Sequence, residues 1–136
     1  MRFTHGFVVV LAACSALVAG CSAQQAHHRM QSHAPAAARS YHATGSASWY
    51  GRYFHGRRTA SGERFNQRAM TCAHRHLPFG TQLRVTNLAN DRSIVVRVND
   101  RGPFVRGRIV DLSHEAARQL QFIGQGHTKV RLEAID

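Results

Sequence analysis

Residues 81–99 read TQLRVTNLANDRSIVVRVN, and this stretch decides the fold class. Apolar and polar residues alternate over 81–87 and again over 93–99, a period typical of β-strands with one buried face. Between the two runs lie residues 88–92, which carry a turn-forming Asn-Asp pair. The sequence therefore predicts a β-hairpin.

The segments on either side of the hairpin continue this pattern in short runs punctuated by glycine. Strands are predicted at 46–50, from Ile109 onward, and at 128–134. In the last of these, Val130 and Leu132 fall on one face. These runs are too short and too regularly interrupted for a helical domain.

A single helix is predicted near the end of the chain. Ser113 is a typical N-cap residue, and Glu115 in the first turn suits the positive end of the helix dipole. Gly124 is placed to end the helix. Several short strands and one short helix in residues 45–136 predict an all-β domain, a compact barrel that closes its own edges.

The segment before residue 45 is predicted to be separate from this domain. The apolar run 7–18 is too short to span a bilayer but suits a secretory signal, so residues 1–20 are interpreted as a signal peptide. The run ends in Val-Ala-Gly-Cys, which resembles the bacterial lipobox, so Cys21 is the expected lipidation site. Cys14 follows a similar tetrapeptide but leaves a shorter apolar run before it. An ordinary signal without lipidation is the remaining alternative.

Residues 21–44 are interpreted as the lipidated cysteine and a flexible linker, because they lack apolar periodicity. Ser22 favours sorting to the outer membrane of a Gram-negative bacterium, with the domain in the periplasm. Cys72 is then the one cysteine left in the domain. It is expected to be a small buried thiol, the alternative being a nucleophile assisted by His74.

The composition is strongly basic, with a net charge of +11, and Lys129 is the one lysine beside 17 arginines. The guanidinium fork of arginine pairs with carboxylates and phosphates, so an anionic partner is expected. Nucleic acid, an anionic membrane face and an acidic polymer all satisfy this condition. Export conflicts with a nucleic-acid role, and no nucleic-acid partner is expected.

Five segments of the domain resemble, in order, the rare lipoprotein A family. They are 47–51 (ASWYG), 59–65 (TASGERF), 73–74 (AH) with 77–81 (LPFGT), 98–104 (VNDRGPF) and 107–113 (GRIVDLS). The resemblance implies a six-stranded double-psi β-barrel. It also implies an endolytic lytic transglycosylase that cleaves MurNAc–GlcNAc bonds in peptidoglycan strands denuded of stem peptides.

In that reaction the muramic acid C6 hydroxyl attacks and leaves a 1,6-anhydro end, so one carboxyl can serve first as acid and then as base. We expect a monomer that needs no cofactor and no metal. The alternative function is a peptidoglycan-binding lipoprotein without turnover, as in expansin-like proteins that share the barrel.

Asp100 is the candidate acid. Strand alternation places it on one face with Val96 and Val98, where apolar surroundings favour a protonated carboxyl, while Arg101 points away. The structural alternative is an aspartate that binds loop amides at the end of a strand.

Glu63 and His74 match the other positions that the family implicates in catalysis. Glu63 follows a Ser-Gly turn signal and is expected on a loop rim, where it stabilises positive charge on the sugar or orients the C6 hydroxyl. His74 is expected to bond Asp100 or a sugar hydroxyl. The alternative for Glu63 is a solvated turn residue without a catalytic role. The alternative for His74 is a structural histidine of the barrel whose ring nitrogens are hydrogen-bonded within the protein. Alternation places His74 and His76 on one face, but no third metal ligand is evident.

Substrate-binding candidates are aromatic and basic. Of Trp49 and Tyr50, one is expected in the core and the other against a sugar ring, although core packing suits both. Asp111 is expected to be a structural anchor rather than a second acid. The arginines expected to flank the groove are Arg57, Arg58, Arg106 and Arg108. They are either readers of muramic carboxylates or part of a generally basic surface.

Overall fold

The computed structural model describes residues 40–135. The predicted signal peptide, Cys14, Cys21 and most of the expected linker lie outside these residues. The first strand, β1 (His42–Trp49), begins before the boundary expected at Gly45. Tyr41, which precedes this strand, packs against the hydrophobic core. The ordered domain therefore starts within the segment that the sequence assigned to the linker.

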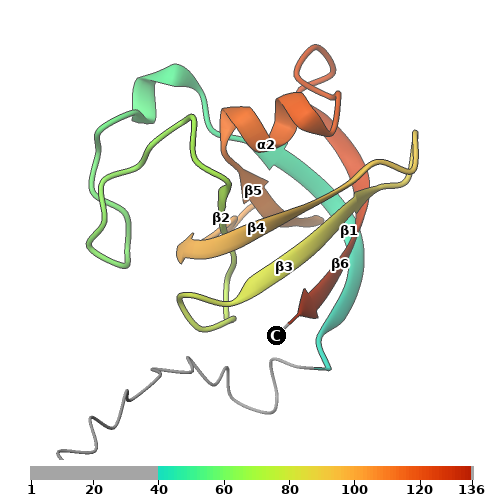
Figure 1. The fold of residues 1–136 in the computed structure, drawn as a ribbon, viewed down its shortest axis with the longest axis horizontal. Coiled ribbons are helices and arrows are strands. Elements are labelled where there is room, and N and C mark those ends of the chain that lie inside the picture. Colours follow the sequence, from blue (N-terminus) through green and yellow to red (C-terminus); the bar gives the residue numbers. More distant parts are fainter. Residues whose placement is uncertain (1–39, 136) are drawn as a thin grey trace, which may run out of the picture. The chain divides into compact units, whose positions relative to one another are not determined.

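Within the described residues, six strands form a closed barrel (Figure 1). Around the barrel the order is β1-β5-β2-β4-β3-β6, and β6 pairs with β1 to close it. The predicted six-stranded barrel is confirmed. After β1, the elements are η1 (Arg52–Phe54, a 3-10 helix), β2 (Thr71–Ala73), β3 (Gln82–Asn87), β4 (Ser93–Asp100), β5 (Arg108–Leu112), α2 (His114–Gln119) and β6 (His127–Ile135).

The predicted hairpin is formed by β3 and β4. The two strands pair antiparallel, with Leu83 opposite Val96 and Val85 opposite Ile94. At the tip, Asp91 takes a left-handed conformation with a φ of 59°, which aspartate tolerates better than most residues. The other edge of β3 pairs with β6. The hairpin is thus built into the barrel wall on both sides.

Strand β2 was not predicted. It has three residues, all buried, so it shows no alternation of apolar and polar positions. It lies parallel to β4 on one side and antiparallel to β5 on the other. Ala73 is the partner of Asp100 in the first pairing and of Asp111 in the second. This short strand therefore sets the ends of β4 and β5 next to each other.

The helix α2 begins as predicted, because the Ser113 hydroxyl accepts the backbone N–H of Ala116 at 3.2 Å. It ends at Gln119, and the stop expected at Gly124 is wrong. The carbonyl of Leu120 accepts the side-chain amides of Asn87 and Asn90, at 2.9 and 3.1 Å. These bonds from the β3–β4 hairpin replace the helical partners of that carbonyl.

The core fills the barrel interior with aliphatic side chains from every strand. Cys72 belongs to it, and burial raises the pKa of its thiol, as expected for a buried structural cysteine. None of the helices in residues 40–135 is long and apolar enough to cross a membrane. The largest fully buried aliphatic side chains are Leu83, Val85, Val96, Val98, Val110, Leu112, Leu120, Val130 and Leu132.

Candidate active site

A cavity of about 350 Å³ opens where the end of β4 meets β5 and the segment that follows β1. Two carboxyl side chains line it, Asp100 on β4 and Asp111 on β5. A larger groove beside α2 contains none of the predicted site residues. The basic residues that line the first cavity are Arg57, Arg58, Arg101 and Arg108, so Arg101, which was expected to point away from Asp100, lines the same cavity. This cavity combines groups able to exchange protons with a cationic rim.

Three donors hold the Asp100 carboxyl in place. Its Oδ2 accepts the Tyr50 hydroxyl at 3.0 Å, and its Oδ1 accepts the backbone N–H groups of Ala60 and Arg101, both at 2.8 Å. Val98, two residues earlier, is fully buried as predicted, but the register with β2 shifts after it, so the regular alternation of β4 does not extend to Asp100. Asp100 thus binds loop amides, as in the structural alternative, and still lines the cavity.

Tyr50 and Trp49 have separate roles. Burial, followed by the charge of Asp100, raises the pKa of Tyr50, so its hydroxyl stays protonated and donates to Asp100. The Tyr50 ring lines the cavity and packs against Phe65, with centroids 5.0 Å apart. Trp49 packs against the core and meets the ring of His114 edge-on. Of the two aromatic candidates, Tyr50 is therefore the one that faces the cavity.

The loop after Asp100 is held by an arginine that sequence reasoning missed. Arg75 donates from Nε to the carbonyl of Pro103, and from Nη2 to the carbonyls of Val105 and Arg108, at 3.0 and 3.2 Å. Gly102 has a φ of 113°, a conformation that favours glycine. No signal distinguished Arg75 from the other arginines of this chain, because its partners are backbone carbonyls.

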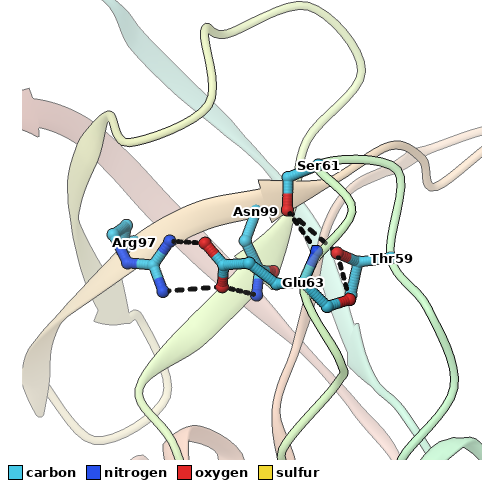
Figure 2. A network of polar contacts seen from close by, with 5 residues as sticks. All are labelled: Thr59, Ser61, Glu63, Arg97 and Asn99. Atoms are coloured by element: carbon cyan, nitrogen blue, oxygen red, sulfur yellow. Dashed lines mark hydrogen bonds and ion pairs between the residues drawn. The ribbon is translucent and has the colours of Figure 1, made fainter.

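Glu63 lies on an exposed loop and is clamped to β4 (Figure 2). Its carboxylate accepts two hydrogen bonds from Arg97, at 2.7 and 2.9 Å, and a longer one from Asn99, at 3.3 Å. The bond from Arg97 is the main cause that lowers the pKa of Glu63. The backbone N–H of Ser61 adds a bond to the Asn99 carbonyl at 3.2 Å. Glu63 does not line the cavity that holds Asp100.

His74 is buried, and both of its ring nitrogens are used. Nδ1 accepts the backbone N–H groups of His76 and Leu77, at 3.2 and 3.1 Å. Nε2 therefore carries the proton and donates to the Tyr41 hydroxyl, 2.9 Å away. The expected side-chain bond to Asp100 is not formed. Instead, the His74 backbone N–H donates to the Asp100 carbonyl at 3.2 Å.

The environment of His74 also fixes its charge. Burial, and then the positive charges of His76, Arg101 and Arg75, lower the pKa of His74 to about 4. The expectation that His74 and His76 share one strand face is wrong, because β2 ends at Ala73 and the two residues lie in the turn beyond it. A neutral, buried ring inside a turn suits a positioning role better than proton transfer.

Three of the four predicted arginines reach the cavity. Arg57 and Arg58 line one wall and Arg108 lines the other, whereas Arg106 is exposed and outside the lining. The Arg57 guanidinium stacks over the exposed ring of Tyr53, 4.0 Å from its centroid. Arg108 is committed to Asp111, whose two carboxylate oxygens both lie 2.8 Å from its Nη2.

Comparisons with known proteins agree with this geometry. A double-psi β-barrel family model described as lytic transglycolase matches residues 42–132. The chain is 58% identical over 93 residues to the endolytic peptidoglycan transglycosylase RlpA of Campylobacter jejuni, covering 68% of this chain and 34% of the relative. It is 50% identical over 99 residues to the protein of the same name from Pseudomonas aeruginosa, covering 73% of this chain and 29% of the relative. The chain therefore spans about a third of the length of these curated relatives.

Solved structures support the barrel fold. A Streptomyces papain inhibitor aligns with a TM-score of 0.56 at 21% identity, covering 71% of this chain and 96% of the inhibitor. A mutant Clavibacter michiganensis expansin in complex with cellohexaose aligns with a TM-score of 0.56 at 20% identity, covering 71% of this chain and 51% of the expansin. At such identities the likeness concerns the fold alone.

Proposed function

Because this chain is a member of the rare lipoprotein A family of double-psi β-barrel lytic transglycosylases, we propose that it cleaves peptidoglycan glycan strands. The bond cut is the one between MurNAc and GlcNAc, within strands denuded of stem peptides. The relatives are named endolytic peptidoglycan transglycosylases, which supports this reaction, and the cationic cavity suits an anionic polymer.

One observation carries the proposal. Asp100 is fixed by three hydrogen bonds and yet lines an open cavity, so its carboxyl can meet a substrate without searching among rotamers. In the reaction, the O4–C1 bond breaks as the C6 hydroxyl of the same muramic acid attacks C1. The leaving oxygen gains a proton and the attacking hydroxyl loses one, and Asp100 takes part in this exchange.

The test is digestion of purified denuded glycan, followed by mass analysis of the new ends. The wild-type protein is expected to release 1,6-anhydro ends, and Asp100→Asn to release none while keeping its fold and its affinity for the glycan. Asp91→Asn is the matched control, since this exposed aspartate lies at the far hairpin tip and asparagine tolerates its left-handed conformation. Equal product from Asp100→Asn and wild type would remove Asp100 from the reaction.

The second candidate function is glycan binding without turnover. It is favoured by the fold shared with an expansin that was solved in complex with cellohexaose. A binding module would retain denuded glycan and release no anhydro ends at any pH. The same digestion, paired with a pull-down on insoluble glycan, separates the two functions.

We also propose that the protein is anchored by lipid on Cys21 and faces the periplasm, on the outer membrane of a Gram-negative bacterium. The apolar run and the Val-Ala-Gly-Cys sequence support this localisation. An anchored enzyme would meet the wall within the reach of its linker.

A further inference from the structure

The cavity contains a second carboxyl, Asp111, which was expected from the sequence to be a structural anchor. Asp111 lies on β5 with 8% of its surface exposed, and it lines the same cavity as Asp100. Ala73 of β2 is the register partner of both aspartates, one on each neighbouring strand. The register of β2 against β4 shifts between Cys72 and Ala73, which brings Asp100 opposite Ala73. Asp100 and Asp111 therefore lie on the two strands that flank Ala73, with their Cα atoms roughly 10 Å apart by strand spacing.

The two carboxyls have different surroundings. Asp100 accepts hydrogen bonds from three donors, one hydroxyl and two backbone amides. Asp111 has one partner, Arg108, on its own strand. Burial is the largest effect and raises the pKa of Asp111, Arg108 lowers it, and the charge of Asp100 raises it again.

The other groups that face Asp111 add no negative charge to its surroundings. Cys72 on β2 is buried and Tyr50 after β1 is half-buried near it, and burial raises the pKa of each, so neither brings a charge at neutral pH. Further positive charge at the cavity comes from Arg57, Arg58 and Arg101. A site that holds two carboxyls in different surroundings, one of them with a raised pKa, has the parts needed to act on one glycosidic bond.

We propose that Asp111 is the second catalytic carboxyl of this cavity and delivers the proton to the leaving sugar. This inference rests on the proposed function, and it makes Asp100 the base rather than the acid expected from the sequence. As the C1–O4 bond breaks, the Asp111 proton passes to O4 of the leaving GlcNAc. The muramic acid C6 oxygen bonds to C1 and passes its proton to the Asp100 carboxylate. Asp111 ends ionised and Asp100 protonated, and proton exchange with solvent restores both.

The competing role is structural. Asp111 would then serve only to hold Arg108, whose carbonyl is in turn bound by Arg75. In that case, removing either member of the Asp111–Arg108 pair would have the same effect on turnover. If Asp111 is the acid, the two removals differ, because Arg108→Gln leaves the proton donor in place.

The test compares Asp111→Asn with Arg108→Gln on denuded glycan, with 1,6-anhydro ends measured as a function of pH. We expect Asp111→Asn to lower kcat on the order of 100-fold or more, with a smaller change in KM. Arg108→Gln should lower kcat by a smaller factor than Asp111→Asn and move the alkaline limb of the kcat profile to higher pH. The sign follows because Arg108 lowers the pKa of Asp111, so its loss lets the acid form persist to higher pH.

Equal losses in the two variants, with an unmoved alkaline limb, would overturn the assignment in favour of the structural role. Thermal unfolding checks the fold of each variant. If Asp111→Asn does not fold, the double variant Asp111→Asn with Arg108→Gln leaves no unpaired buried charge, and its turnover is compared with that of Arg108→Gln alone. A wild-type protein that releases no anhydro ends would refute the transglycosylase function and this step with it. Full turnover in Asp111→Asn would refute this step alone.

Discussion

The carboxylate of Glu63 and the guanidinium of Arg97 form two parallel hydrogen bonds that tie an exposed loop to the outer side of β4. The same loop carries Ala60, whose backbone N–H donates to Asp100 in the cavity. The ion pair therefore helps to fix a donor that positions the reacting carboxyl. Both side chains are more than a third exposed, so their pairing adds only about 0–1 kcal/mol to stability.

If Glu63 acts by holding this loop, Glu63→Gln and Arg97→Gln should lower turnover by similar factors, because each breaks the same clamp. The free energy of unfolding should change by less than about 1 kcal/mol in both. Turnover is measured on denuded glycan, and Glu133→Gln is the control, since its ion pair with Arg84 lies on the β3–β6 face. A loss in Glu63→Gln that far exceeds the loss in Arg97→Gln would show that Glu63 touches the sugar.

The sequence predicted elements with a strong local signal. The β3–β4 hairpin, the start of α2 at Ser113 and the apolar row leading to Asp100 all follow from alternation, turn residues or capping. Strand β2 was not predicted, because its three residues are all buried and show no alternation of apolar and polar positions. The end of α2 was not predicted either. It depends on hydrogen bonds from Asn87 and Asn90 to Leu120, which lie some thirty positions apart in the chain and leave no local signal.

The residues of the candidate site were predicted mainly from the family motifs, and only partly from strand alternation and burial. Asp100 could be placed at the end of an apolar strand face, whereas its partner Asp111 enters the cavity through pairing with the unpredicted β2. Arg75 and Arg97 bind a loop and a carboxylate that lie far away in the sequence. In a chain with 17 arginines, local sequence carries no signal for which of them have partners.

The buried ring of His74 predicts a pH dependence of stability. Its pKa is lowered to about 4, whereas the unfolded chain titrates near 6.5. As pH falls from about 6.5 to about 4, the unfolded state binds a proton that the folded state excludes. The free energy of unfolding therefore decreases, at most by an amount on the order of 3 kcal/mol. Urea unfolding between pH 7 and pH 4.5 should therefore show the stability gap between wild type and His74→Gln narrowing at low pH. If the free energies of unfolding of the two proteins change in parallel with pH, His74 is not held neutral by its burial.

The lipid anchor can be tested independently of activity. Cys21→Ser should give a protein that no longer sediments with membranes, whereas Cys14→Ser should still do so, because the longer apolar run ends at Cys21. Membrane fractionation with metabolic labelling by a fatty acid measures both. Label that survives in Cys21→Ser and disappears in Cys14→Ser would move the anchor seven positions toward the N-terminus.

The cationic cavity predicts how denuded glycan is recognised. Removal of stem peptides at the lactyl group leaves a free carboxylate on each muramic acid, so a denuded strand is a regular polyanion. Arg57 and Arg58 line one wall of the cavity, and the stacking of Arg57 on Tyr53 occupies the face of its guanidinium rather than the N–H edges that bind carboxylates. Arg108 is already paired with Asp111, and Arg101 donates to the backbone carbonyls of His74 and Leu77. Arg57 and Arg58 are therefore the cavity arginines left for a lactyl carboxylate, and Arg58 uses only its Nη1 on the Gly62 carbonyl.

The double variant Arg57→Gln with Arg58→Gln should therefore bind denuded glycan more weakly, by roughly 2- to 10-fold, because each exposed pair contributes about 0–1 kcal/mol. Arg106→Gln is the matched control, since this arginine is exposed but does not line the cavity. Binding is measured in the Asp100→Asn background, to denuded glycan and to the same glycan with its lactyl groups amidated, at low and high salt. The wild-type arginines should prefer the free carboxylates and lose that preference as salt rises, because screening weakens exposed charge pairs. Equal affinity for the two glycans, or an equal loss in the control, would assign the arginines to a generally basic surface.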